Sequence, residues 1–426
     1  MTTSVTSALA IDAGRTIAGH DPAGLVQTYG SPLYVYDAAV LRARAAALRS
    51  ALPDRVEVAY ATKANGSPVV LSTLAAAGLG ADVASGGELR AALRAGFDPA
   101  RIVFTGPGKT DAELEAAFEA RIGTLTIESL DELEAVLVRA SMVVPGQGLA
   151  LRLATENEAE GLPIISARGN VKFGLTEAEA DEAVMRLRTS GALAPEGPFV
   201  LRGFHAFGAS NVRGAGVLVE AAADLARRAE HIARRHGLEV HLLDAGGGLG
   251  IPYDAGETAL DIEALGAGLA AEIATWSERP TLRAARLLLE PGRWLAAPAG
   301  TYLCTVTRTK PRDGRVVAIC DGGIHHLLRP RLVGQDHRLV AVGAASERAV
   351  DARLDLVGPL CTGLDILASD VLGPRPRVGD IFAVLDAGAY GYSESMLLFL
   401  THPTPAEIVV EEDGTIAVSR ERIEPA

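Results

Sequence analysis

The fold class is decided by stretches such as Val56-Glu57-Val58-Ala59-Tyr60-Ala61-Thr62-Lys63-Ala64-Asn65, in which a short, largely apolar run is followed by a lysine. Its apolar part, Val56–Tyr60, is the first of eight such runs. The others are Leu79–Val83, Ile102–Phe104, Thr124–Ile127, Leu149–Leu153, Val200–Phe204, Val240–Leu243 and Leu287–Leu289. Most are continuous rather than alternating in hydrophobicity, which is typical of parallel strands buried on both faces.

The segments between these runs have helical character. Ala112–Ala120, Leu130–Ala140 and Val217–Arg235 carry apolar residues at the three- and four-residue spacing of a helix that covers a core. Repeated strand–helix units without a dinucleotide-binding fingerprint favour a closed (β/α)8 barrel of the TIM type over an open sheet. The sequence therefore predicts an α/β protein built on a parallel barrel.

The pattern changes after Arg293, where shorter runs separated by turn residues predict a mostly antiparallel β domain. These runs are Tyr302–Thr307, Arg315–Ile319, Leu339–Val342, Ile381–Leu385 and Glu407–Val410. Leu33–Tyr36 also has the character of a strand, and the first helix is expected at Ala38–Leu52. We therefore expect an N-terminal segment, residues 1–37, that joins the β domain. A barrel over residues 38–293 and a C-terminal β domain over residues 294–426 would follow it.

The composition sets further limits. The chain has 426 residues, of which 48% are hydrophobic, and a net charge of −13. This predicts a filled core and argues against a general binder of nucleic acids or anionic membranes, which would carry the opposite charge. No transmembrane stretch or signal peptide is evident, so a cytoplasmic protein is expected. The three cysteines, Cys304, Cys320 and Cys361, show no disulfide framework or zinc spacing, and no metal site is expected.

Reactive side chains and glycines stand where the predicted barrel strands end. Lys63 follows the first run, Asp82 lies near the end of the second, His205 follows the sixth and Glu290 the eighth. Three glycines, residues 246–248, come after the seventh run. In (β/α)8 barrels the chemistry gathers at the carboxyl ends of the strands. We therefore expect these groups to converge at one mouth of the barrel.

Each of these residues has a chemical role to which it is suited, and an alternative. Burial lowers the pKa of a lysine, which would leave the Lys63 amine neutral and able to bond to a carbonyl carbon; the alternative is a lysine that reaches solvent. Glu290 is suited to keeping a pyridine nitrogen protonated, unless it pairs with Arg293. The glycines leave backbone N–H groups free for a phosphate, or merely form a tight connection. His205 either stacks on a planar ring or makes a structural hydrogen bond.

Eight motifs, taken together and in this order, resemble the fold-type III pyridoxal-phosphate-dependent decarboxylases. This is the group of the diaminopimelate and ornithine/arginine decarboxylases, whose fold is similar to that of alanine racemase. The resemblance covers about residues 33–408. The motifs are Tyr60–Asn65, Asp82–Glu88, Lys172–Gly174, Phe204–His205, Asp244–Gly248, Glu290–Arg293, Gly358–Cys361 and Asp386–Tyr390.

The resemblance implies pyridoxal 5′-phosphate as the cofactor and loss of the α-carboxylate of an amino acid as CO₂. Lys63 would hold the cofactor covalently, His205 would stack on its ring and Glu290 would pair with the ring nitrogen. The other cofactor-binding residues that it implies are Asp82, Ser210, Gly247, Gly248, Gly292, Arg293 and Tyr390, most of them around the phosphate.

The resemblance also implies a homodimer with shared active sites. Cys361 and Asp365 would lie on a loop of the β domain that reaches into the partner's site, and Cys361 would protonate the carbon that CO₂ has left. The substrate would contact Arg293, Thr362, Asp365 and Tyr390. The alternative for Cys361 is a buried, apolar cysteine, which is the interpretation that we give to Cys304 and Cys320.

One position departs from the family's pattern. Thr362 follows Cys361, where diaminopimelate decarboxylases have Glu and ornithine decarboxylases have Asp, the acid that binds the distal ammonium group of a free diamino acid. The segment His205–Asn211 is also two residues longer than its usual counterpart. We therefore predict a substrate with an uncharged distal end, such as an amino acid linked to a carrier protein or another conjugate of secondary metabolism, rather than free diaminopimelate.

Three alternatives stay open. Glu158 or Glu160 could replace the missing acid, which would allow free diaminopimelate, ornithine, lysine or arginine as the substrate. An amino-acid racemase would need a catalytic tyrosine in the β domain, and a non-catalytic homologue would be expected to have lost Lys63, Glu290 or Cys361. If a carrier protein docks, Arg329, Arg331 and His337 are the candidate basic patch, unless they form a solvated loop.

Overall fold

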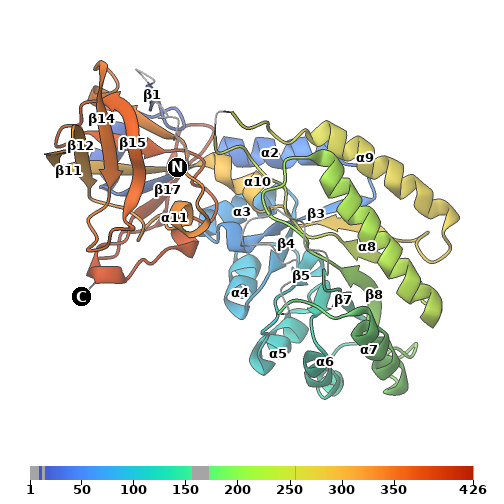
Figure 1. Ribbon diagram of the computed structural model, residues 1–426. Coiled ribbons are helices and arrows are strands. Elements are labelled where there is room, and N and C mark those ends of the chain that lie inside the picture. Colours follow the sequence, from blue (N-terminus) through green and yellow to red (C-terminus); the bar gives the residue numbers. More distant parts are fainter. Residues whose placement is uncertain (1–8, 12–14, 156–171, 255, 426) are drawn as a thin grey trace.

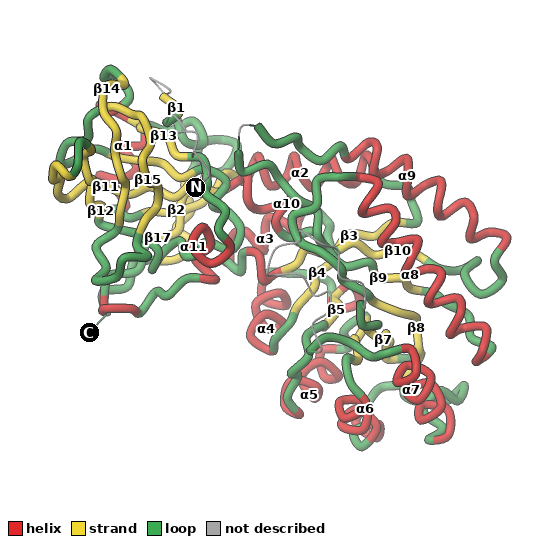
Figure 2. Tube along the Cα trace, viewed as in Figure 1, coloured by secondary structure: helices red, strands yellow, loops and turns green. Residues whose placement is uncertain are grey.

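The structure is a computed structural model that describes residues 9–11, 15–155, 172–254 and 256–425. Two bodies lie side by side, a barrel surrounded by helices and a domain made mainly of strands (Figure 1). The trace coloured by secondary structure shows the barrel strands inside their ring of helices and the second group of strands at the other end of the molecule (Figure 2).

The barrel is closed by eight strands in the order β10-β3-β4-β5-β6-β7-β8-β9, and each strand is parallel to its neighbours. The strands are β3 Val56–Ala61, β4 Gly80–Val83, β5 Ile102–Phe104, β6 Thr124–Ile127, β7 Gln147–Arg152, β8 Phe199–His205, β9 Leu242–Asp244 and β10 Arg286–Leu289. Each predicted run overlaps one strand. The predicted (β/α)8 barrel is therefore confirmed.

Helices cover the outside of the barrel (Figure 1). They are α2 Ala38–Ala51, α3 Pro68–Ala76, α4 Gly86–Arg94, α5 Asp111–Ala120, α6 Leu130–Leu137, α7 Glu177–Thr189, α8 Ala215–His236, α9 Ile262–Thr275 and α10 Arg293–Ala296. Local capping sets several of their ends. Thr110 and Glu113 form a capping box at the start of α5, and α8 ends at Gly237 in the left-handed conformation.

The second domain is a ten-stranded sheet in which β1-β13-β16-β11-β12-β14-β15 form one path and β2, β17 and β18 extend it from β11. Its strands are β1 Ala10–Ile11, β2 Leu33–Asp37, β11 Gly300–Arg312, β12 Arg315–Cys320, β13 Leu339–Val342, β14 Val350–Val357, β15 Ile366–Pro374, β16 Ile381–Val384, β17 Ala406–Val410 and β18 Ile416–Arg420. Most pairs are antiparallel, as predicted, but β1–β13, β12–β14 and β2–β17 are parallel. Two short helices, α1 Pro22–Tyr29 and α11 Arg329–Val333, complete the domain.

The two bodies meet at the end of β3. The backbone N–H of Tyr390 donates to the carbonyl of Ala64 at 2.7 Å, and the Asn65 side chain donates to the carbonyl of Gly388 at 2.9 Å. These bonds hold the segment after β16 against the barrel mouth. None of the helices in the described part of the chain combines the length and the apolar character needed to cross a bilayer.

Candidate active site

The strand ends bring a lysine and an aspartate into contact. Lys63 lies in a short 3₁₀ turn directly after β3, and its Nζ is 2.6 Å from Oδ2 of Asp82, in β4. The other oxygen of this buried carboxylate accepts a hydrogen bond from the Thr105 hydroxyl at 2.6 Å. Asp82 is thereby fixed from both sides and positions the lysine amine at the barrel mouth.

The expected lowering of the Lys63 pKa is not what the structure shows. Burial does lower the pKa, but the carboxylates of Asp82 and Glu290 outweigh it and raise the pKa of Lys63 above its ordinary value. About 45% of the side chain is exposed to solvent. The cost of burial alone predicts a neutral amine, but with these two carboxylates beside it the amine is protonated in this state.

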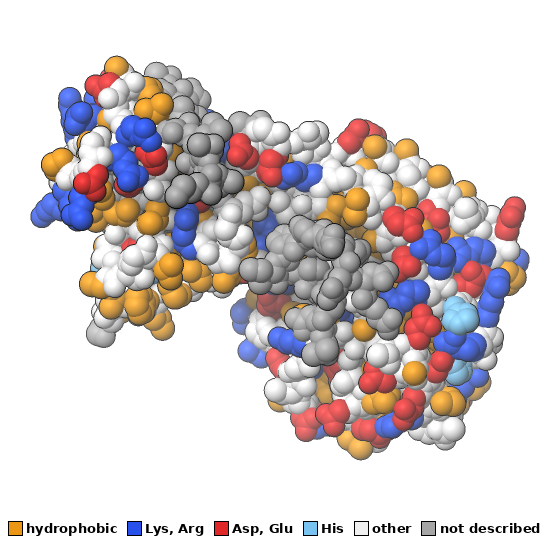
Figure 3. Space-filling model, viewed as in Figure 1, with side chains coloured by type: hydrophobic (Ala, Val, Ile, Leu, Met, Phe, Trp, Pro, Cys, Tyr) orange, Lys and Arg blue, Asp and Glu red, His pale blue; other side chains and the backbone are white. Residues whose placement is uncertain are grey.

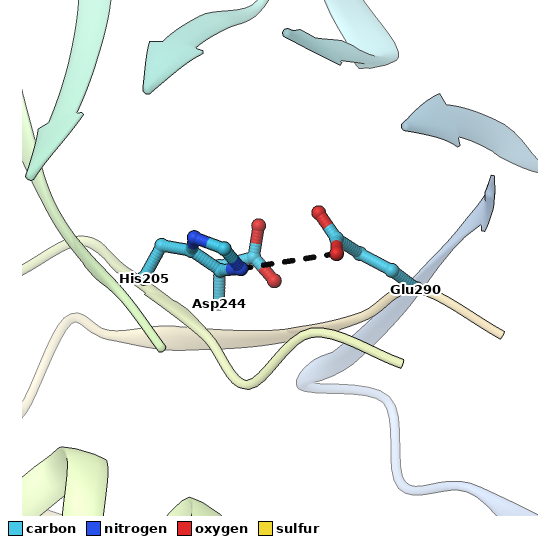
Figure 4. Close-up of side chains that lie close together, drawn as sticks. All are labelled: His205, Asp244 and Glu290. Carbon is cyan, nitrogen blue, oxygen red and sulfur yellow. Dashed lines mark ion pairs between the residues drawn. The ribbon is translucent and has the colours of Figure 1, made fainter. Parts of the chain in front are cut away.

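Three buried side chains from neighbouring strands point toward one another beside this lysine (Figure 4). His205, Asp244 and Glu290 come from the ends of β8, β9 and β10, and their nearest polar atoms lie within 4.8 Å of one another. Neither ring nitrogen of His205 has a hydrogen-bond partner among the described residues. One carboxylate oxygen of Glu290 also lacks such a partner there. Buried polar atoms are almost always satisfied, so unpaired atoms here indicate a place for a polar ligand.

Burial shifts the protonation of all three groups toward the neutral form. It lowers the pKa of His205 well below the ordinary value, and the cations Arg152 and Lys63 lower it further. Burial raises the pKa of Asp244 to about 7 and also raises that of Glu290, to which Asp244 adds its negative charge. Because His205 is then neutral at pH 7, its 3.8 Å contact with Glu290 is not a pair of opposite charges.

A cavity beside these groups collects most of the predicted cofactor residues. It is lined by Lys63, Ser210, Gly247, Gly248, Glu290, Gly292, Arg293 and Tyr390, together with Ala61, Phe207, Asn211 and Leu249. A side chain at Gly247 would come within 2.3 Å of the Glu290 carbonyl, and one at Gly248 within 2.5 Å of the Ala209 carbonyl. Only glycine fits at these two positions, and the backbone there stays open toward the cavity.

Arg293 is held rigidly at the edge of this cavity. It is buried, and it donates to the Tyr253 hydroxyl at 2.8 Å and to the Ser210 hydroxyl at 3.2 Å. Its guanidinium carbon lies 4.8 Å from the centre of the Tyr390 ring. Glu290 is therefore not its partner, and the cation remains available to an anion in the cavity.

Arg329, Arg331 and His337 were expected to form a solvated loop, or an exposed basic patch if a carrier protein docks, and both expectations are wrong for Arg329 and His337. Arg329 is buried, pairs with Glu394 at 2.8 Å and covers the Tyr390 ring at 4.3 Å. His337 donates through Nδ1 to the Leu385 carbonyl at 2.9 Å, and its ring packs on Tyr253. Both side chains therefore pack on the two tyrosines that flank Arg293.

The structure places Cys361 and Thr362 apart from these groups, in the loop between β14 and β15. The Cys361 thiol is exposed, so the alternative of a buried cysteine is wrong for this residue, whereas Cys304 and Cys320 are buried as expected. The position of Asp365 does not match the contact with substrate that was expected of it. It is buried, and its two oxygens accept from the backbone N–H groups of Ile324 and Leu360, at 2.8 Å each.

Two residues of the site, Asp244 and Tyr253, were not among the predicted site residues. Asp244 stood in a quoted motif, and its position at a strand end was the signal that could have added it to the candidates. Tyr253, which anchors Arg293, gave no such signal, because it lies nine residues after the end of β9, within the long connection to α9. The two glutamates at 158 and 160 lie outside the described residues.

The residues present suit pyridoxal 5′-phosphate. The cofactor needs an amine for its carbonyl carbon, a carboxyl group at its ring nitrogen and anion-binding groups for its phosphate. Lys63 offers the first, Glu290 with its unpaired oxygen offers the second, and the glycine backbone with Arg293 offers the third. His205, Asp244 and Glu290 also have the composition of a metal site, but a metal would leave the glycine cradle unexplained.

Comparisons with known proteins agree with this fit. Residues 38–297 match the family model of the pyridoxal-dependent decarboxylases, pyridoxal binding domain. The chain is 32% identical to diaminopimelate decarboxylase of Aquifex aeolicus over 399 residues, which cover 93% of this chain and 90% of that protein. It is 30% identical to L-glutamyl-[BtrI acyl-carrier protein] decarboxylase of Niallia circulans, over 93% of this chain and 92% of that protein.

Solved structures give the same result. The crystal structure of diaminopimelate decarboxylase from Helicobacter pylori, complexed with L-lysine, superimposes with a TM-score of 0.84 and 28% identity over 95% of this chain and 96% of that one. The resemblance seen in the motifs thus extends over about 95% of the chain. The site at the strand ends, the fold and these relatives together show that the chain belongs to the family of pyridoxal-phosphate-dependent amino-acid decarboxylases.

Proposed function

We propose that this enzyme removes the α-carboxylate of an amino acid whose distal end carries no free ammonium group, such as an amino acid linked to a carrier protein. The observation that carries the proposal is Thr362, which follows Cys361 in place of an acidic residue. An uncharged distal amide or thioester needs no acidic partner. The carrier-protein decarboxylase of Niallia circulans is a relative with a substrate of this class.

Apart from Glu158 and Glu160, which lie outside the described residues, two acids of the β domain are candidates to replace the missing carboxylate, and both are already engaged. Asp365 uses both oxygens on backbone N–H groups, and Glu394 pairs with Arg329. A free diamino acid would therefore lose a charge-assisted bond worth about 1.5–3 kcal/mol, or roughly 10- to 150-fold in binding. This disfavours free diaminopimelate, ornithine and lysine as substrates.

The proposed roles of the residues follow from their positions. When bound, pyridoxal 5′-phosphate supplies a ring that withdraws the electrons of the bond to the departing carboxylate. Lys63 would hold the cofactor through Nζ, and Asp82 would orient the lysine. Glu290 and Asp244 are the acids that would set the protonation of the ring nitrogen, and His205, kept neutral by burial, would pack on the ring.

Further residues would bind the phosphate and move a proton. Ser210, Gly247, Gly248, Gly292, Arg293 and Tyr390 would surround the phosphate, with Arg293 supplying the positive charge. Cys361 Sγ would donate a proton to the carbon that CO₂ has left, acting from the partner subunit of a homodimer with shared sites.

CO₂ release from cofactor-loaded protein tests the proposal. The panel contains free diaminopimelate, ornithine, lysine, arginine and glutamate, and a glutamate whose side-chain carboxyl is joined as a thioester to a pantetheine arm. We expect release from the conjugate and little from the free basic amino acids. Rapid release from one of the basic amino acids, with none from the conjugate, would overturn the proposal.

A pair of variants sharpens this test. Thr362→Glu restores the acid, and it should raise CO₂ release from free diaminopimelate by roughly 10- to 150-fold. Thr362→Gln has nearly the same shape without the charge and should give no such gain. Equal activity of the two variants would show that the charge at this position does not select the substrate.

Decarboxylation of free diaminopimelate is the second candidate. Its support is the name of several relatives, among them the enzymes of Aquifex aeolicus and Helicobacter pylori. The panel separates the two candidates directly, because the second predicts fast CO₂ release from diaminopimelate by the unmodified enzyme.

A further inference from the structure

A second, larger cavity borders the segments that carry Arg293 and its partner Tyr253. Its volume is about 570 Å³, which is within the range of sites for small molecules. Its walls come from α2, from the chain between β9 and α9, from α10 and from two charged residues of the β domain, Arg338 and Asp386. The apolar part of the lining includes Val40, Ala43, Ala47, Ile251, Leu260 and Trp294.

One arginine is held flat inside this cavity. The guanidinium carbon of Arg44 lies 3.7 Å from the centre of the Trp294 ring, and its Nε donates to the Trp294 carbonyl at 2.6 Å. Its two terminal amino groups have no hydrogen-bond acceptor among the described residues. A guanidinium in this position presents a fixed fork of donors, the arrangement that matches a carboxylate or phosphate group.

The charges around Arg44 do not balance. Asp386 is the one carboxylate among the described residues of the lining, and it is already bound by Arg338, whose Nε and Nη2 lie 3.0 and 2.6 Å from the same oxygen. Burial lowers the pKa of Arg44 to about 10, although the charge of Asp386 opposes this shift. A half-buried guanidinium that makes no ion pair with any described carboxylate is stabilised by an anion that enters the cavity.

We propose that this cavity is a binding site for a small molecule that carries a carboxylate or phosphate group on a flat, apolar body. The anionic group would accept from the two amino groups of Arg44. The apolar body would lie along Val40, Ala43 and Leu260, where it replaces water. The inference does not depend on which amino acid the enzyme decarboxylates.

The cavity lies where a bound ligand would contact residues that support the active site. Trp294 is the next residue after Arg293 in α10, and Pro252 in the lining precedes Tyr253, which anchors Arg293. Asp386 begins the segment that ends in Tyr390. A ligand in the cavity would therefore contact the segments that hold Arg293 and Tyr390, two of the residues proposed to bind the phosphate, without entering the barrel mouth.

Isothermal titration calorimetry with phenyl phosphate tests the proposal. The protein is loaded with cofactor, so that the phosphate-binding groups at the barrel mouth are occupied. We expect saturable binding of phenyl phosphate, at least tenfold weaker binding of inorganic phosphate and no binding of phenol. Arg44→Gln should weaken the binding of phenyl phosphate at least tenfold. Arg49→Gln, which removes the same charge from the same helix outside the cavity, should leave it unchanged.

A second variant guards against a folding defect in the first. Ala43→Phe places a ring at an exposed position that borders the cavity and should block the ligand without disturbing the core. The proposal is overturned if phenyl phosphate does not bind, or if it binds Ala43→Phe and the unmodified enzyme equally well. Equal weakening by Arg49→Gln and Arg44→Gln would also overturn it, because the effect would then be one of net charge.

Discussion

Cys361 is the residue on which the proposed protonation step depends, and its thiol is exposed on a loop. Replacing it by alanine removes the acid but leaves the cofactor site intact. We expect Cys361→Ala to slow formation of the amine product by about 10²-fold. It should also divert part of the reaction toward a carbonyl product. Quantifying CO₂, amine and carbonyl compound measures both effects. Cys304→Ala, at a buried thiol, should leave the ratio of products unchanged, and an unchanged ratio in Cys361→Ala would remove this thiol from the mechanism.

Asp244 makes the stability of the cofactor-free protein depend on pH. Its pKa in the folded protein is about 7, against about 3.9 when unfolded, because burial favours the neutral acid. The folded state therefore binds more protons between these values, and stability is lost as the pH rises from about 4 through 7. We expect the melting temperature to fall over this range, by roughly 2–4 °C for each kcal/mol lost.

The variant Asp244→Asn serves as the control for this titration. It keeps the shape of the side chain and cannot ionise, so its melting temperature should fall less steeply between pH 5 and 8. The pKa of Glu290 is also raised, so Glu290 would account for the pH dependence of the melting temperature that remains in Asp244→Asn. Parallel curves for the two proteins would contradict the assignment.

At the scale of elements, one buried ion pair joins the ends of two barrel strands. Arg152, at the end of β7, lies 2.9 Å from both oxygens of Glu128, which follows β6, and Glu128 also accepts from the Gly106 backbone. Arg152→Ala would leave a buried carboxylate without its cation, at a cost of about 3–5 kcal/mol. Urea unfolding measures this cost.

An exposed pair provides the comparison. Arg353 and Asp370 bridge β14 and β15 at the surface, where water screens them, so Arg353→Ala should cost far less stability than Arg152→Ala. If Arg152→Ala and Arg353→Ala lowered the free energy of unfolding equally, burial would not be the reason that the Arg152–Glu128 pair stabilises the protein.

The elements also show where sequence reasoning succeeded. Buried parallel strands are continuous apolar runs, which is why all eight barrel strands could be located. β14 and β15 were not anticipated, because charged residues such as Asp351, Arg353 and Asp370 interrupt them. Their pairing with one another and with β12 stabilises them, and a single chain segment does not reveal such contacts.

The site was only partly predictable for a related reason. The residue types at the strand ends identified Lys63, Asp82, His205 and Glu290 before their positions were known. The raised pKa of Lys63 depends on a carboxylate 19 residues away in the sequence. The inward position of Arg329 depends on Tyr390 and Glu394. Properties that arise from contacts between distant segments could not be predicted from local patterns.

At the scale of the whole molecule, an apolar surface on the β domain supports the proposed homodimer. In the segment after Tyr390, Leu398 has 76% of its surface exposed, and Phe399 and Leu400 are also exposed. Figure 3 shows hydrophobic side chains gathered along the lower edge of this domain. Contiguous apolar surface on a folded protein is typical of an interface, and we expect light scattering to give a dimer.

Complementation tests whether the two sites of that dimer are shared. Lys63→Ala and Cys361→Ala subunits should each be inactive, or nearly so, alone. After subunit exchange, half of the dimers are mixed and one of their two sites carries both residues, so roughly a quarter of the normal activity should return. Exchange confirmed by mass spectrometry without a return of activity would show that each site is built within one chain.

The buried carboxylate of Asp365 has a consequence for how this enzyme can evolve. It ties Leu360 to Ile324, and it closes the loop at both ends of the short window from Cys361 to Leu364. Three of the four residues in this window are exposed. In the proposed dimer, mutations inside the window would change the surface offered to a substrate in the partner's site, while the anchors preserve the fold. New specificities would then arise there by single substitutions, whereas a change at Asp365 would release the whole loop at once.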